Sequence, residues 1–174
     1  KETLEVSTKA MELKQYYDPN YVRSANTHLM DTIANDYFRA KFVGFDANEE
    51  RVRPDCPLIY ASNHSGMAFP WDAITFASQT LKAQDYELRR MPRALVAPML
   101  SHTRITAPYL LPNFWKRCGC VDATTDNFET MMESAESDVL IYPEGVPGIA
   151  KGFNNKYQLQ RFSSSFVRMA IEHQ

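Results

Sequence analysis

The sequence lacks several features that would place it in a special class of protein. None of its apolar runs approaches the roughly 18 residues that a membrane-spanning helix needs, so we expect no transmembrane helix. The start, Lys1-Glu2-Thr3, is charged and no apolar stretch follows it, so we expect no signal peptide. The 19 basic residues nearly balance the 21 acidic ones, and the net charge of −2 excludes a global basic field for nucleic acid.

Cysteine and histidine are too few and too scattered to predict a disulfide framework or a metal site. Cys56, Cys118 and Cys120 are an odd number, and one residue separates the last two, whereas common zinc and redox motifs have two. The 4 histidines lie far apart along the chain. We therefore expect reduced thiols in a cytosolic compartment and no bound metal.

What the sequence does contain is an alternation of short apolar runs and helical patterns. Strands are predicted at 42–45, 57–62, 94–97, 119–121 and 138–142. Helices are predicted at 26–42 with Asn26 or Thr27 as a cap, from Pro70 onward, within 99–117, from a capping box of Asp126 and Glu129, and finally through a stripe of Leu159, Phe162, Phe166 and Met169. This order favours an α/β fold whose mixed, mostly parallel central sheet has helices on both faces. The chain ends inside a helical pattern, so we expect its C-terminal part to be missing.

The first candidate site follows the predicted strand 57–62 and runs from Asn63 to Asp72. A histidine whose ring meets a carboxylate is held in one tautomer, as a general base acting on an alcohol requires. Asp72 follows Pro70 at the predicted start of a helix, where the helix dipole stabilises a negative charge. We therefore predict that His64 and Asp72 form a dyad. The alternative is a plain turn in which His64 caps backbone groups.

The second candidate site follows the predicted strand 138–142 and contains Pro143-Glu144-Gly145. Proline and glycine here predict a tight turn beside a carboxylate, with backbone N–H groups left to hold an anion or an acceptor hydroxyl. The alternative is a strand-to-loop turn with a solvated glutamate. Both loops follow the carboxyl ends of predicted strands, where ligands of open α/β sheets bind.

Together, Asn63-His64…Asp72 and Pro143-Glu144-Gly145 resemble the glycerolipid acyltransferase superfamily, which includes the lysophosphatidic acid and glycerol-3-phosphate acyltransferases. The resemblance covers residues 57 to 173 and is closest to the branch with His-Ser-Gly followed by a proline and an aspartate, as His64-Ser65-Gly66 and Pro70-Trp71-Asp72 have here. It implies one acyltransferase domain over residues 1–174, with a helical segment at 1–45 and a catalytic core at 57–174.

The resemblance also implies an activity in phospholipid biosynthesis. An O-acyltransferase would move a fatty acyl group from an acyl-CoA or acyl-carrier-protein thioester to the hydroxyl of a glycerolipid or lysophospholipid acceptor. His64 would be the general base and Asp72 its orienting partner, without metal or cofactor. The substrate-binding residues would be Asn63, Ser65, Gly66, Glu144, Gly145, Lys151 and Arg161, with backbone donors near Ser65 and Gly66 holding the oxyanion. We expect a cytoplasmic protein at the membrane surface, with no nucleic-acid partner.

The sequence departs from the family pattern at three places. Seven residues separate His64 from Asp72, and the shorter spacing that is commonest in the family would put the aspartate at Phe69. Val146 and Pro147 stand where a hydroxyl residue and an arginine are usual, and residues 119–124 lack a further arginine. Bidentate arginine is the best grip on a phosphate dianion, so an acceptor with a less charged head is favoured. Lys116, Arg117, Lys151 and Arg161 are the candidate substitutes, although each type is commonly a solvated surface charge.

Two other functions compete with the acyltransferase. Ser62 and Ser65 flank His64 and permit a serine hydrolase, but no Gly-x-Ser-x-Gly elbow occurs in the chain. A non-catalytic lipid- or acyl-carrier-binding module on the same fold would explain the long spacing and the missing arginines. A further cluster, Arg89, Arg90 and Arg93, precedes the predicted strand at 94–97 and is interpreted as solvated charge, with lipid headgroups or coenzyme A phosphates as the alternative.

Overall fold

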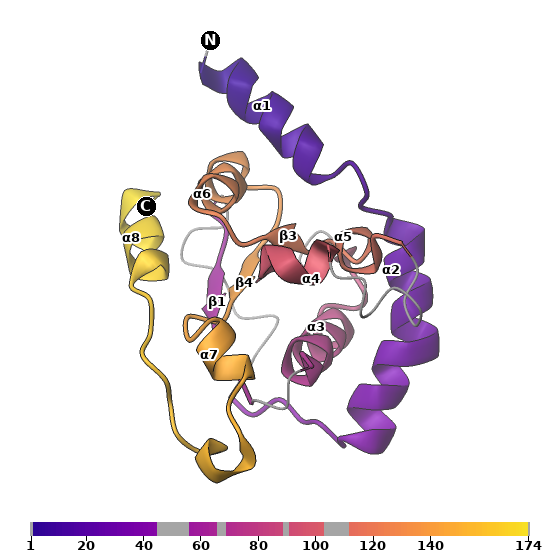
Figure 1. Cartoon of the computed structure of the whole chain (residues 1–174). Helices are drawn as coiled ribbons and strands as arrows, with labels where there is room; N and C mark the ends of the chain where they lie inside the picture. Colours follow the sequence, from indigo (N-terminus) through magenta and orange to yellow (C-terminus); the bar gives the residue numbers. More distant parts are fainter. Residues whose placement is uncertain (1, 45–55, 66–68, 89–90, 103–111, 174) are drawn as a thin grey trace.

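A parallel β-sheet forms the centre of the protein (Figure 1). The structure is a computed structural model, described for residues 2–44, 56–65, 69–88, 91–102 and 112–173. Its strands are β1 (Ile59–Ala61), β2 (Arg93–Val96), β3 (Val121–Asp122) and β4 (Val139–Ile141), in the spatial order β1-β4-β2-β3. Each pairing described is parallel, and β1 aligns Tyr60 with Leu140 of β4. The predicted α/β class is therefore confirmed.

Helices surround this sheet, and their bounds follow the chain as listed next. They are α1 (Glu2–Leu13), α2 (Pro19–Ala25), the π-helical turns η1 (Asn26–Met30) and η2 (Thr32–Tyr37), α3 (Trp71–Ala83), α4 (Pro98–His102), α5 (Phe114–Arg117), α6 (Thr125–Ser134), α7 (Val146–Ile149), the 3₁₀ turn η4 (Phe153–Asn155) and α8 (Ser165–Glu172). In Figure 1 the amino end of α1 projects from the body, whereas α6 and α8 lie on the opposite side of the sheet from α3.

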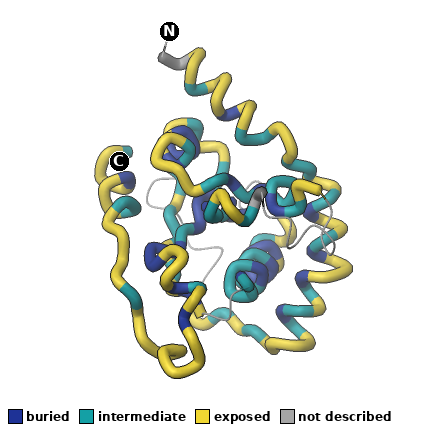
Figure 2. Tube along the Cα trace, in the orientation of Figure 1, coloured by how far each residue is buried: buried dark blue, intermediate teal, exposed yellow. Residues whose placement is uncertain are grey.

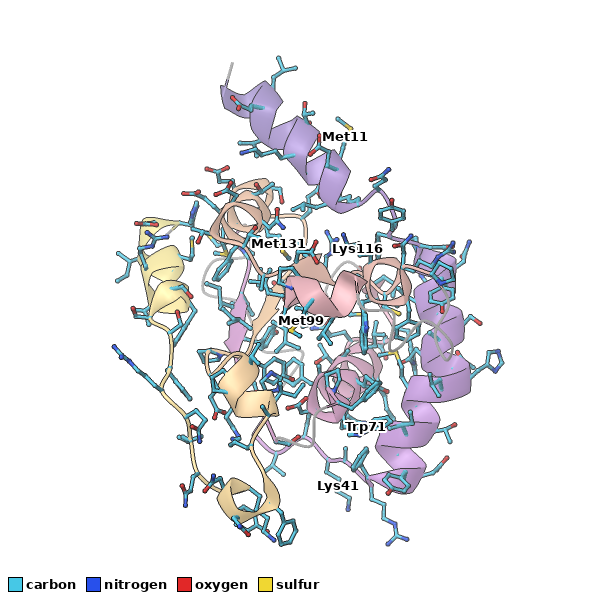
Figure 3. The ribbon with its side chains drawn as sticks, viewed as in Figure 1. Met11, Lys41, Trp71, Met99, Lys116 and Met131 are labelled. Carbon is cyan, nitrogen blue, oxygen red and sulfur yellow. The ribbon has the colours of Figure 1, made fainter. Side chains whose placement is uncertain are left out.

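Alternating side chains of the strands build two apolar layers, one on each face of the sheet. On the face of α6 and α8, Val139 of β4 packs with buried residues of both helices; this cluster comprises Leu95, Val121, Phe128, Met131, Met132, Val139 and Met169. On the other face, Met30, Ile74 and Trp115 form a cluster beneath α3. Figure 2 shows the resulting buried stripes of α3 and α6, and Figure 3 labels Met131 on α6 and Trp71 at the start of α3.

Several helix boundaries differ from the sequence predictions because other side chains act as caps. The Asp18 carboxylate accepts hydrogen bonds from the backbone of Asn20 and Tyr21, so the helix expected at Asn26 begins at Pro19. Thr124 accepts the bond from the Asn127 N–H that opens α6, so the predicted capping box of Asp126 and Glu129 is wrong.

Two predicted elements are absent from the residues that the structure describes. Residues 42–44 of the predicted first strand are irregular, and residue 45 lies outside the described residues. The last helix begins only at Ser165 and leaves Leu159 and Phe162 in an exposed, irregular segment. Its backbone bonds elsewhere, since the Ser163 N–H donates to the Pro143 carbonyl and the Gln160 N–H donates to Glu144.

Arg93 is the buried first residue of β2, so its interpretation as a solvated charge is wrong; Arg89 and Arg90 lie outside the described residues. Its guanidinium donates to the carbonyl of Gly119 at 2.7 Å and to the carbonyl of Leu13 at 2.8 Å. The same group lies over the ring of Tyr17. Arg93 therefore joins the end of α1 to the chain before β3 instead of meeting a headgroup.

The cysteine thiols give a test of this packing. Burial raises the pKa of Cys118 and Cys120 to about 12, and the thiolate is the reactive form. We expect both to react with a disulfide reagent such as DTNB at pH 8 far more slowly in the folded protein than after denaturation. Per-residue mass spectrometry of alkylated protein would measure this, and equally fast labelling of Cys118 and Cys120 in both states would contradict the packing.

Candidate active site

The order of the strands brings the two candidate loops together. Because β1 and β4 are parallel neighbours, the chain leaves both at the same edge of the sheet, and the Ser62 N–H still donates to the Ile141 carbonyl at 2.9 Å. His64 follows β1, Glu144 follows β4, and the His64 main-chain N–H donates to Glu144 Oε1 at 2.9 Å. Residues 80 positions apart in the sequence are thus in direct contact.

Asp72 reaches His64 despite the long spacing between them. The helix α3 begins after Pro70, which places Asp72 in its first turn, next to Trp71 in Figure 3. Asp72 Oδ2 lies 2.9 Å from His64 Nδ1 and accepts a second hydrogen bond, of 2.8 Å, from the Ser65 N–H. The first turn of a helix and the bend after β1 therefore hold the carboxylate and the imidazole together.

The ionisation of Asp72 fixes which nitrogen of His64 carries the proton. Burial disfavours the charged carboxylate, but hydrogen bonds from His64, Ser65 and Ala73 outweigh burial and lower the pKa of Asp72. An ionised carboxylate only accepts hydrogen bonds, so Nδ1 of His64 is the donor. The lone pair of a neutral His64 ring then lies on Nε2, which is the atom available as a base.

Tyr142 holds the plane of the His64 ring. The two rings are stacked, with centroids 4.0 Å apart and planes 8° from parallel. Tyr142 is buried, and burial is the main reason that the pKa of its hydroxyl is raised, so the ring stays neutral. Ring and carboxylate together restrict both the tilt and the rotation of the imidazole.

Glu144 is buried and occupied by protein groups on both oxygens. Oε1 accepts the His64 N–H, Oε2 accepts the Gln160 N–H at 2.8 Å, and Lys151 Nζ lies 3.0 Å from Oε2. Burial opposes the charge, but the Gln160 N–H, Lys151 and the His64 N–H outweigh burial and lower the pKa of Glu144. The carboxylate thus anchors two loop backbones, and the alternative of a solvated glutamate is wrong.

Glycine is required at two positions of the turn that follows Glu144. Gly145 has φ 61° and ψ −150°, a conformation that residues with a Cβ rarely adopt. At Gly148 a Cβ atom would lie 2.5 Å from Glu144 Cβ and 3.2 Å from His64 Cβ. The chain after β4 therefore passes directly against the histidine and its anchor.

The other predicted site residues have varied positions. Asn63 and Ser65 are exposed beside His64, Arg161 is exposed in the segment before α8, and Gly66 lies outside the described residues. The Ser65 N–H donates to Asp72, and the Gly145 N–H donates to the Tyr142 carbonyl, so neither is free to hold an oxyanion or an anion. Lys116, a candidate substitute for the missing arginines, pairs with Asp122 at 3.1 Å.

Sequence reasoning missed Tyr142, Gly148 and Gln160 as parts of the site. Tyr142 ends the predicted strand, and a position directly before Pro-Glu-Gly was the available signal for it. Gly148 lies within the loop that was singled out. Gln160 contributes only its backbone N–H, so no property of its side chain pointed to the site.

An apolar pocket lies on the α3 face of the sheet. Its walls include Ala73, Ile74 and Ala77 of α3, with Ala94 and Leu140 of the sheet opposite. The cavity volume is about 50 Å³, well below the roughly 150 Å³ of an engineered cavity that binds benzene. A long acyl chain would enter it only after the walls had moved.

Comparison with known proteins agrees with this geometry. The model of the family described as Acyltransferase matches residues 45–174, a stretch that includes both loops of the site. The chain belongs to the acyltransferase family.

The similar proteins are distant and carry no assigned activity. Uncharacterized proteins of Mycobacterium bovis and Mycobacterium tuberculosis are each 24% identical over 156 residues, which is 89% of this chain and 40% of theirs. An uncharacterized protein of Mycobacterium leprae is 22% identical over the same length. The chain thus spans about two fifths of the length of these relatives, and no solved structure matches it.

Two structural searches concern the described residues alone. Among the described helices, none combines the length and the apolar character needed to cross a bilayer. Over the same part of the chain, no three His, Cys, Asp or Glu side chains are grouped so that they could hold a metal ion.

The lowered pKa values predict how stability depends on pH. A carboxyl group whose pKa is lower in the folded than in the unfolded state stabilises the fold above its unfolded pKa, and this contribution is lost as the pH falls through the folded pKa. With ordinary values of 3.8 for Asp72 and 4.5 for Glu144, we expect the free energy of unfolding to fall below about pH 4.5. Denaturant titrations from pH 7 to 3 would show a shallower fall for Asp72→Asn, and an unchanged slope would contradict the assignment.

The close approach at Gly148 predicts a specific cost of adding one methyl group. Gly148→Ala forces Glu144 and His64 apart, and we expect a loss of about 1–3 kcal/mol in the free energy of unfolding. Gly152→Ala is the matched control, because a Cβ there meets nothing within 4 Å. Urea denaturation of both variants would measure the difference, and equal stabilities would show that the turn relaxes freely.

Proposed function

We propose that this chain is the catalytic part of an O-acyltransferase that uses His64 as a general base. Membership of the acyltransferase family supports the transfer of an acyl group. The observation that carries the proposal is the 2.9 Å contact of His64 Nδ1 with Asp72 Oδ2, which leaves Nε2 as the base. The donor is an acyl thioester of coenzyme A or of an acyl-carrier protein, and the acceptor is a hydroxylated lipid.

The chemical steps follow from the protonation state of His64. Nε2 takes the proton of the acceptor hydroxyl while Asp72 stabilises the imidazolium that forms. The alkoxide oxygen attacks the thioester carbonyl to give a tetrahedral intermediate, and the C–S bond then breaks. The departing sulfur takes the proton from Nε2, so an ester and a free thiol result and His64 is neutral again.

The charges around the site bear on the acceptor. Val146 and Pro147 form the start of α7, so the standard position of the family's arginine contributes no cation here. Lys151, a candidate substitute, is buried and paired with Glu144. These features favour an acceptor with a less charged head than a phosphate monoester, presented at a membrane surface.

Substitution of the dyad tests the proposal. We expect His64→Ala to lower kcat by roughly 10²- to 10⁴-fold, the usual contribution of general base catalysis, and Asp72→Asn to lower kcat because the tautomer of His64 is no longer fixed. The measurement is release of free thiol from acyl-CoA and acyl-carrier-protein thioesters with a panel of acceptor lipids.

The His64→Ala result also separates the enzyme from a binding module on the same fold. Ser62→Ala is the matched control, because Ser62 lies two residues away and its hydroxyl bonds only to the neighbouring Asn63 carbonyl among its recorded contacts. Acyl transfer that persists unchanged in His64→Ala would end the catalytic proposal. Thioester or lipid binding without turnover by the wild-type chain would favour the binding module.

A further inference from the structure

His64 is held by three different contacts, and one of them depends on a buried ion pair. Asp72 binds the ring nitrogen, Tyr142 stacks on the ring face, and Glu144 accepts the main-chain N–H. The first two contacts orient the ring, whereas the third fixes the backbone from which the ring projects. The backbone contact exists only while the carboxylate of Glu144 stays in place.

Lys151 is the cation that faces this carboxylate. Its Nζ lies 3.0 Å from Oε2 and 3.4 Å from Oε1 of Glu144. The side chains of Lys151 and Glu144 are only 2% and 0% exposed, so the pair is almost fully removed from water. The backbone contacts of Glu144 with His64 and Gln160 complete the surroundings of the carboxylate.

We propose that Lys151 is a positioning residue of the acyltransferase, which neutralises Glu144 inside the protein and thereby fixes the backbone of the base His64. This inference rests on the proposed function and deepens it. Lys151 acts on the reaction through Glu144 and His64, without contact to the acceptor. It therefore differs from a cation that grips a substrate phosphate.

Electrostatics explain why the pair is needed. A buried carboxylate without a partner is strongly destabilised, and removing one member of a buried pair leaves an uncompensated charge. Without Lys151, Glu144 either takes up a proton or moves toward water. Both changes weaken its bond to the His64 N–H, and a displacement of about 1 Å in a catalytic group can cost on the order of 100-fold in rate.

The segment after η4 supplies the third member of this arrangement. The Gln160 N–H donates to the same Oε2 atom that Lys151 contacts, which ties an otherwise exposed stretch to the site. Figure 2 shows this stretch as exposed between α7 and α8. Lys151 therefore connects the loop after β4, the histidine loop and the stretch before α8.

A kinetic comparison of lysine variants tests the proposal. Lys151→Gln removes the charge and retains a hydrogen-bond donor, Lys151→Arg retains the charge, and Lys156→Gln is the control at an exposed lysine of the same segment that lies over the Phe153 ring. We expect Lys151→Gln to lower kcat by about 10- to 100-fold with less than about a twofold change in the acceptor KM. We expect Lys151→Arg to recover most of kcat and Lys156→Gln to match the wild type.

The outcomes distinguish positioning from substrate binding. A rise in the acceptor KM at unchanged kcat in Lys151→Gln would overturn the proposal, because it would place Lys151 on the acceptor. An unchanged kcat and KM would overturn it as well. If the wild-type chain transfers no acyl group to any acceptor, the proposed function fails, and the positioning role is then decided by spectroscopy.

The spectroscopic test needs no variant and no substrate. In the wild-type chain, the amide signals of His64 and Gln160 both report on Glu144, since both N–H groups donate to it. We expect the two NMR signals to shift together as the pH falls, with one shared midpoint below the ordinary glutamate value of 4.5. Separate midpoints, or a midpoint above 4.5, would show that no ion pair holds the anchor and would overturn the proposal.

Discussion

The parallel pairing of β1 with β4 is the constraint on which the site depends. Parallel neighbours end at the same edge of a sheet, so the two loops that carry polar groups must leave side by side, although 80 residues of chain separate them. The strand order β1-β4-β2-β3 achieves this because β4 returns to the middle of the sheet after β3. Had β4 added at the outer edge of β3, Glu144 would lie two strands further from His64, and the anchor of the histidine backbone would be lost.

The start of α3 solves the second geometric problem, which is the long bend between the histidine and its acid. A carboxylate in the first turn of a helix is stabilised by the helix dipole and by nearby N–H groups. Asp72 uses one oxygen for the Ala73 N–H and the other for both the Ser65 N–H and the His64 ring. The same carboxylate thus closes the bend and orients the base, so the spacing between the two residues matters less than the place at which the helix begins.

The sequence predicted the site better than it predicted the local structure around it. Strands such as Val139–Ile141 are short, fully apolar and followed by turn residues, so their periodicity is unambiguous. The last helix was overextended because Leu159 and Phe162 continue an apolar stripe, yet the backbone of that stretch bonds to Pro143 and Glu144. Likewise Arg93 and Lys151 have the composition of surface charge, and only the tertiary contacts with Gly119 and Glu144 reveal that both are buried. Local propensity cannot foresee partners that arrive from distant parts of the chain.

The buried pair of Lys151 and Glu144 illustrates why charge is retained where apolar residues would also pack. Two apolar side chains of similar size are often at least as stabilising as a buried ion pair, because desolvation offsets most of the attraction. Apolar side chains, however, would leave the His64 and Gln160 N–H groups buried without an acceptor. A neutral amide offers a single acceptor oxygen and cannot serve both donors. A carboxylate can, and once it is buried it requires a cation. The geometry of the base therefore accounts for Glu144, and Glu144 in turn accounts for Lys151.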